Sequence, residues 1–112
     1  LTVTGPSDVA ELRGGEIHRF TVSPEDAGLK SHSIDAIIGG TPAENAAALS
    51  DVLDGAKSAY RDIVLLNAAA ALVVADKAGD LKEGAALAAR SIDDGAARHA
   101  LDTMAWISRG EA

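Results

Sequence analysis

The sequence predicts an α/β fragment, in which a short strand and a β-hairpin come first and a helical C-terminal half follows. Two observations predict this order. Residues up to about Gly40 are rich in β-forming side chains and turns, whereas the rest of the chain is alanine-rich with helical periodicity. Residues 63–75 are almost uniformly apolar, which predicts a helix buried on every side. A chain of 112 residues has little core for such a helix, so we expect the rest of its own polypeptide to surround it.

Glycine and proline divide the β-forming part. Residues 1–4 predict a short strand that stops at Gly5, where the following proline fixes φ. Residues 9–13 and 16–22 predict a hairpin around Gly14 and Gly15, because tight two-residue loops need positive φ angles. This loop length fixes the pairs that face each other: Arg13 with Glu16, Leu12 with Ile17, Glu11 with His18, and Val9 with Phe20. Both charged pairs are then complementary across the strands.

Capping residues mark where the helices begin. Ser23 followed by proline predicts a short helical turn. Thr41 and Glu44 have the spacing of a capping box, which predicts a helix over residues 42–54 that Gly55 ends. The remaining boundaries follow from the same signals: a helix from Ser58 to about residue 78 that stops at Gly79, a helix after Asp80 with Glu83 that breaks at Gly95, and a last helix ending near Ser108.

Composition excludes several classes of function. Ten Lys and Arg against 17 Asp and Glu give a net charge of −7 without a basic cluster, so we expect no nucleic-acid partner. No apolar stretch approaches the roughly 20 residues that a membrane span needs, so we expect no membrane partner either. The absence of cysteine excludes thiol chemistry and fits a cytoplasmic location. Because position 1 is Leu and no signal-like segment follows, we expect a chain that begins within a longer protein.

Few titratable residues have spacing typical of a site. His18, His32 and His99 are too scattered for a metal motif, so structural or solvated roles are the better interpretation. Asp93 and Asp94 form an acidic pair that suits Mg²⁺, but their place between two helices favours capping beside the next glycine.

Two further features carry a structural and a functional interpretation. Gly39 and Gly40 precede a helix, a geometry that can bind an anion, although Thr41 and Pro42 are explained by capping alone. Asn67 lies within the apolar helix, where an amide without partners costs about 1–3 kcal/mol. We expect its amide to tie the helix to a neighbouring loop, and that loop could belong to a substrate site elsewhere in the protein. The residues themselves support no catalytic triad, dinucleotide motif or pair of catalytic carboxylates.

Three motifs in order resemble the anthranilate phosphoribosyltransferase family. TGPSDVAELRGGEIHRFTVSPEDAGL, at residues 4–29, is similar to that family's hairpin region, which typically contains TGPT, VAEL and TPEDFGL. RDIVLLNAAAAL, at residues 61–72, resembles its late buried helix, preceded by the glycines and an ENA segment. The resemblance continues through residues 81–97, and one departure is Ala27, where the family usually has an aromatic side chain.

The resemblance implies a two-domain enzyme with its active site between a small helical domain and a larger α/β domain of the phosphoribosyltransferase and nucleoside phosphorylase kind. Such an enzyme moves the phosphoribosyl group of phosphoribosyl pyrophosphate onto anthranilate in tryptophan biosynthesis, with Mg²⁺, and is expected to form a homodimer through its helical domain. Residues 1–112 would be the C-terminal part of the α/β domain, with the N-terminal helical domain and the glycine-rich loops outside them.

The family's ligand residues all precede the segment that matches residues 2–6, and its acidic metal pair comes immediately before that segment. No catalytic, cofactor-binding or metal residue is therefore carried onto residues 1–112, and we expect this chain alone to be inactive. A pyrimidine nucleoside phosphorylase is an alternative, which the VAEL and NAAAAL motifs disfavour. A non-catalytic interaction module is another; it predicts a self-contained core, whereas the fragment predicts exposed apolar surface.

Overall fold

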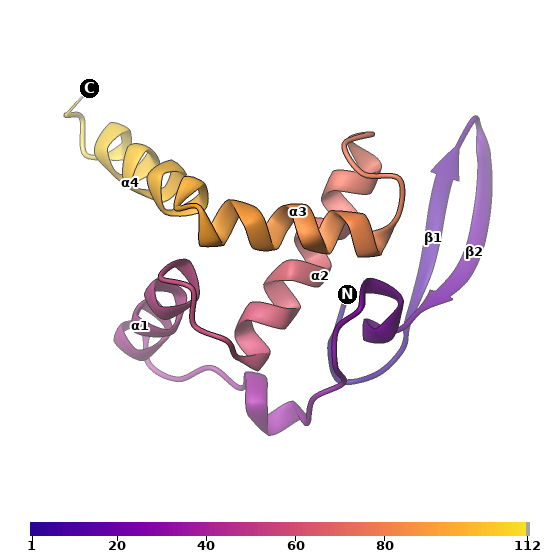
Figure 1. The fold of residues 1–112 in the computed structure, drawn as a ribbon, viewed down its shortest axis with the longest axis horizontal. Helices are drawn as coiled ribbons and strands as arrows, with labels where there is room; N and C mark the ends of the chain where they lie inside the picture. The colour runs from indigo at the N-terminus through magenta and orange to yellow at the C-terminus, as the bar shows by residue number, and fades with distance from the viewer. Residues whose placement is uncertain (112) are drawn as a thin grey trace.

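The computed structural model of the chain describes residues 1–111. It confirms a hairpin followed by a helical half, with strands β1 and β2 joined antiparallel. The elements are β1 (Ser7–Arg13), β2 (Glu16–Val22), the 3-10 turns η1 (Pro24–Ala27) and η2 (Ile34–Ile37), and the helices α1 (Pro42–Leu53), α2 (Ala59–Val74), α3 (Leu81–Asp93) and α4 (Ala96–Ser108). The hairpin projects at one end and α4 at the other, while α3 crosses α2 between them (Figure 1).

The hairpin has the predicted register. All four expected pairs face each other, and both loop glycines adopt left-handed φ angles of 58° and 80°. The charged side chains of these facing pairs, however, make their ion pairs along each strand rather than across. Arg13 lies 2.8 Å from Glu11 on its own strand, and His18 lies 3.8 Å from Glu16 on its own strand. Residues two apart share one face of a strand, so a long side chain can reach along the strand as well as across it.

The short strand expected at residues 1–4 is not formed. This segment has no strand beside it to pair with among the described residues. Its backbone bonds instead to scattered partners, since Thr2 N donates to the Ser7 hydroxyl and Val3 O accepts from His32 N at 2.8 Å. Val3 itself is fully buried, so the segment is held by packing rather than by a ladder.

The helices begin where their caps predict. The hydroxyls of Thr41 and Ser58 and the carboxylate of Asp80 each accept a hydrogen bond from the backbone N–H three residues on. The end of α2 differs from the prediction of about residue 78, because the chain turns at Asp76, whose φ is 54°. Aspartate tolerates this left-handed conformation better than most residues, so the helix stops before Gly79 is reached.

The core lies between α2 and α3. Gly84 of α3 meets Ala69 of α2 so closely that a Cβ at position 84 would lie 2.8 Å from the Ala69 Cα. Around this contact are two clusters of buried side chains, one with Val3, Val22, Ala27, Leu66, Ala69 and Ala85, and one with Val52, Leu65, Ala88 and Ile92. Small residues therefore set how near the two helices come.

Helix α2 is buried on one face only among the described residues, and its burial on every side, which we expect with the rest of the polypeptide around it, stays a prediction. Leu65, Leu66 and Ala69 are buried, but Val64 is 41% exposed and Val74 is 82% exposed. The described part of the chain provides cover for one face of the helix only. Within residues 1–111, no helix combines the length and apolar character that crossing a bilayer requires.

Candidate functional site

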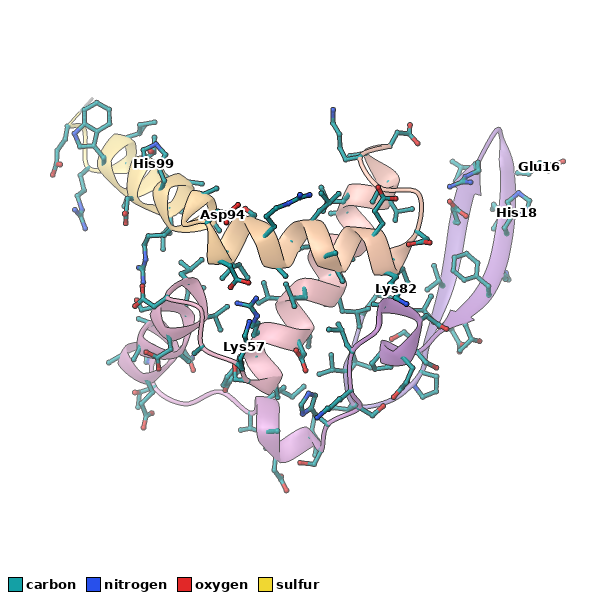
Figure 2. The ribbon with its side chains drawn as sticks, in the orientation of Figure 1. Glu16, His18, Lys57, Lys82, Asp94 and His99 are labelled. Atoms are coloured by element: carbon teal, nitrogen blue, oxygen red, sulfur yellow. The ribbon has the colours of Figure 1, made fainter. Side chains whose placement is uncertain are left out.

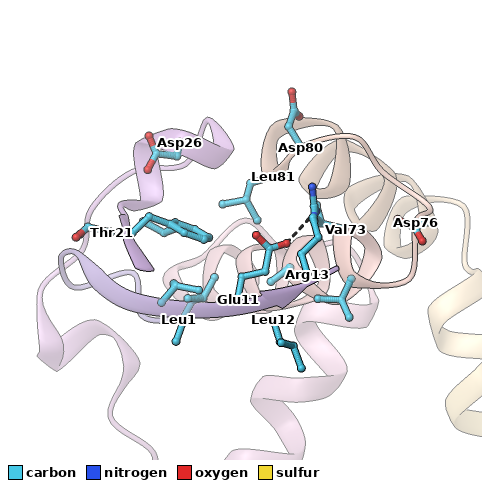
Figure 3. Close-up of a pocket in the computed structure, with 16 residues that line it drawn as sticks. Leu1, Glu11, Leu12, Arg13, Thr21, Asp26, Val73, Asp76, Asp80 and Leu81 are labelled. Carbon is cyan, nitrogen blue, oxygen red and sulfur yellow. Dashed lines mark ion pairs between the residues drawn. The ribbon is translucent and has the colours of Figure 1, made fainter. Parts of the chain in front are cut away.

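A groove lies between the hairpin and the second half of α2. It encloses about 770 Å³, and its apolar lining includes Leu1, Val9, Phe20, Val73, Val74 and Leu81 (Figure 3). We call this the hairpin groove. Its rim carries four carboxylates and one guanidinium, from Glu11, Arg13, Asp26, Asp76 and Asp80.

Four of the five charged groups of the hairpin groove, those of Glu11, Arg13, Asp26 and Asp80, have structural partners. Glu11 is paired with Arg13 (Figure 3). The Asp26 carboxylate accepts from Ser23 N at 2.8 Å, and the Asp80 carboxylate accepts from Glu83 N at 2.8 Å. These contacts hold a strand and two helical turns, and they bring no nucleophile to a base. The groove thus offers apolar surface rather than reacting groups.

Asn67 ties α2 to the N-terminal segment, as its place in an apolar helix predicted. Its Oδ1 accepts from the Leu1 ammonium at 2.7 Å, and its Nδ2 donates to Leu1 O at 2.8 Å. The same Nδ2 donates to Ile63 O at 2.9 Å. One side chain thus satisfies both backbone polar groups of one residue, which fixes where that residue lies on the helix.

The acidic pair has a partner that sequence reasoning missed. Arg61 is 3% exposed, and its Nη2 donates to Asp93 Oδ2 at 2.9 Å. Its Nη1 lies 2.8 Å from Oδ1 as a charge contact without an aligned hydrogen bond. The hydrogen bond from Arg61 lowers the pKa of Asp93, with burial opposing it and the charges of Arg61 and Lys57 adding to it. Asp94 is the residue that caps the end of α3, as its position predicted.

The three histidines do not converge. His18 lies on the hairpin and His99 on α4, at opposite ends of the structure (Figure 2). The contact between His32 and Asp62 was not predicted. His32 Nε2 lies 2.7 Å from Asp62 Oδ2, and both side chains are partly buried. His32 N also donates to Val3 O, so this residue joins the N-terminal segment to α2.

The glycine loop before α1 is occupied by its own neighbours. Gly40 N donates to Asn45 Oδ1 at 2.8 Å, and Asn45 Nδ2 returns a bond to Gly40 O at 3.2 Å. Thr41 N donates to the Glu44 carboxylate at 2.7 Å, which completes the predicted capping box and lowers the pKa of Glu44. Because these amides already have acceptors, an anion here would have to displace two side chains. The Asn45 side chain lies only five residues after Gly40, so this contact could have been predicted from the sequence.

The described residues do not fit a magnesium ion. Among residues 1–111, no three His, Asp or Glu side chains come close enough to share one metal. The acidic pair is unsuited as well, because both Asp93 oxygens face the Arg61 guanidinium. A divalent cation would have to compete with a buried positive charge for the same carboxylate.

Comparisons with known proteins find that this chain is similar to part of several anthranilate phosphoribosyltransferases. It is 58% identical over 111 residues to an anthranilate phosphoribosyltransferase from Parvibaculum lavamentivorans, which covers 99% of this chain and 33% of that protein. It is 56% identical over 110 residues to one from Mesorhizobium japonicum, covering 98% of this chain and 33% of that protein. The crystal structure of the enzyme from Thermus thermophilus superposes with a TM-score of 0.82 at 36% identity, over 92% of this chain and 30% of that one.

The chain spans about a third of the length of the curated relatives it matches. The model of the glycosyl transferase family, a/b domain, matches residues 1–98, which include the hairpin, the Asn67 contact and the close crossing of α2 and α3. That match covers well over half of the sequence, and so the chain belongs to the glycosyl transferase family, a/b domain.

Proposed function

We propose that the protein to which this chain belongs transfers the phosphoribosyl group of phosphoribosyl pyrophosphate to anthranilate and releases pyrophosphate, a step of tryptophan biosynthesis. One observation carries the proposal. Nearly the whole chain matches anthranilate phosphoribosyltransferases at more than half identity, and its fold superposes on one of them with a TM-score of 0.82.

Within that protein we assign residues 1–112 to the C-terminal part of the α/β domain, with a helical domain and glycine-rich loops elsewhere. The role of this part is support. The polar groups described above are used in caps, ion pairs and the tie between Asn67 and Leu1, and none is arranged for group transfer. Substrates and Mg²⁺ would then be bound by residues outside this part.

The remaining features of the proposed enzyme follow from the same similarity. It would act as a homodimer in the cytoplasm, where a chain without cysteine is stable to the reducing conditions. Magnesium would be needed to neutralise the pyrophosphate that leaves, because charge develops there in the transition state.

The test is an assay of the full-length protein with phosphoribosyl pyrophosphate, anthranilate and Mg²⁺, following loss of anthranilate together with release of pyrophosphate. Turnover is expected, and it should disappear when Mg²⁺ is chelated. A parallel assay supplies pyrimidine nucleosides and inorganic phosphate, where turnover would favour a nucleoside phosphorylase instead. No turnover in either assay would favour a non-catalytic role. The 112-residue chain alone is expected to be inactive, and activity comparable to the full-length protein would contradict the division of roles.

A further inference from the structure

His32 joins three parts of the structure through one residue. Its backbone N–H donates to Val3 O at 2.8 Å, which holds the N-terminal segment, and its Nε2 lies 2.7 Å from Asp62 Oδ2 on α2. The loop that carries His32 runs from the end of η1 to the start of η2. Separating this loop from both the N-terminal segment and α2 therefore requires that both contacts of His32 open.

The two ring nitrogens of His32 have different surroundings. A carboxylate carries no proton at neutral pH, so the Nε2 that faces Asp62 is the nitrogen that donates. Nδ1 has no hydrogen-bond partner among residues 1–111, and it is not one of their fully buried polar atoms, so it can exchange a proton with solvent. Imidazole ordinarily gains or loses this second proton between about pH 5 and about pH 8. The ring can thus change its charge while its bond to Asp62 stays in place.

Asp62 is the one charged group in contact with the His32 ring in the described part of the chain. The two side chains are 24% and 23% exposed, so solvent screens their attraction only in part. The charged groups on the surrounding elements have other partners or face solvent: on η1, Glu25 bonds to Ser31 and Asp26 to Ser23; on α2, Arg61 pairs with Asp93; the Leu1 ammonium bonds to Asn67; and Lys30 of the loop and Asp35 of η2 are exposed. A change in the charge of the ring therefore acts mainly on Asp62.

We propose that His32 and Asp62 form a pH-sensitive clasp, which holds the loop between η1 and η2, and Val3 with it, more firmly on α2 when the imidazole is protonated. The closed contact places a positively charged ring against a carboxylate, so it binds the proton more tightly than the opened contact does. By linkage, the clasp is strongest on the acid side of the imidazole titration and weakens as the pH rises through it. The proposal goes beyond the proposed reaction and does not require its turnover.

The first test is made on the unmodified full-length protein. Hydrogen exchange of the His32 backbone amide is measured between about pH 5.5 and about pH 8 and is expressed as a protection factor, which removes the intrinsic effect of pH on exchange. This amide exchanges only when its bond to Val3 O opens, so we expect its protection factor to fall about three- to fivefold over the range, as the loss of one partly exposed ion pair allows. The amide of Ala75, which donates to Ala71 O at the end of α2, is the internal control. A protection factor at His32 that changes no more than that at Ala75, or that rises with pH, would overturn the proposal.

Two variants assign the effect to this pair. His32→Gln keeps a side-chain N–H that can reach Asp62 but cannot become charged, and Asp62→Asn removes the carboxylate while keeping its shape. In both variants we expect the protection factor at position 32 to be independent of pH over the same range. His99→Gln is the matched control, since His99 is exposed on α4, and it should keep the full dependence on pH. A dependence that persists in either His32→Gln or Asp62→Asn would assign the effect to another group and overturn the proposal.

Circular dichroism at both ends of the pH range checks that each protein keeps the same helical content. The first test needs no substitution, so it can refute the proposal even if a variant does not fold. Neither test measures turnover. An inactive protein whose His32 amide responds to pH would therefore refute only the proposed function, and an active protein whose His32 amide does not respond would refute only this inference.

Discussion

Arg61 of α2 and Asp93 of α3 meet across 32 residues of sequence, with two nitrogen–oxygen distances of 2.8 and 2.9 Å. The two partners differ in environment, since the arginine side chain is 3% exposed and the aspartate side chain is 45% exposed. A buried guanidinium depends on its counter-charge far more than a half-exposed carboxylate does. Removing the carboxylate should therefore lower the stability of the fold more than removing the guanidinium.

This asymmetry predicts an order of stability. Asp93→Asn leaves the buried guanidinium without its charge partner and should lower Tm by roughly 5–10 °C. Arg61→Met leaves a carboxylate that solvent can hydrate, and it should lower Tm less. The neighbouring Asp94→Asn is the matched control and should change Tm by no more than about 2 °C. Thermal unfolding followed by circular dichroism gives the order, and a larger loss for Arg61→Met than for Asp93→Asn would contradict it.

The same pair predicts a dependence on acid. Because the Arg61 hydrogen bond lowers the pKa of Asp93 in the folded state below its ordinary value of 3.8, the stabilisation is present above that value. It is lost as pH falls through the lower folded pKa. The difference in Tm between the unmodified chain and Asp93→Asn should therefore be constant from about pH 7 to pH 5 and shrink below about pH 4. A difference that stays constant down to about pH 2 would show that the pair does not titrate in this way.

The contact between α2 and α3 predicts an unusual response at a helical glycine. Replacing glycine by alanine inside a helix usually stabilises it by about 1 kcal/mol. Gly84→Ala should do the opposite, because its Cβ would lie 2.8 Å from both Cα and O of Ala69, which are backbone atoms that cannot move aside. Overpacking of this kind costs about 1–3 kcal/mol. Denaturant unfolding measures the change, and a stabilised Gly84→Ala would mean that the two helices can separate freely.

Burial separates two large side chains of similar character. Leu66 has no exposed surface, so Leu66→Ala should cost about 2–5 kcal/mol through the cavity it leaves. Met104 on α4 is 62% exposed, and Met104→Ala should cost less than about 1 kcal/mol in the 112-residue chain. Equal losses from urea unfolding would show that α4 packs more tightly than described.

Local rules account for what the sequence predicted correctly. Two glycines in a two-residue loop determined the register of the whole hairpin, and Thr41, Ser58 and Asp80 determined three helix starts. Each of these depends on residues within a few positions of one another. Asn67 was also interpreted correctly as a tie, because an amide in an apolar helix must find partners.

The features that could not be predicted all depend on distant contacts. Arg61 with Asp93, and His32 with Asp62, are about 30 residues apart, and no periodicity links them. The absence of a strand at residues 1–4, and which face of α2 is the exposed one, depend on what lies beside them in space. The burial of an apolar helix is decided by its neighbours, whereas its start is decided by its own cap.

The crossing of α2 and α3 has a mechanical consequence. Where a glycine lies directly against another helix's backbone, there is no side chain that could rotate to let the two helices slide. The Asp80 cap of α3 borders the hairpin groove, its first turn lies against the α2 backbone at Gly84, and Asp93 anchors its far end to α2. A helix of 13 residues is about 20 Å long. Helix α3 is thus a rigid element of that length. A displacement of its N-terminal end at the hairpin groove must therefore move α2 as well.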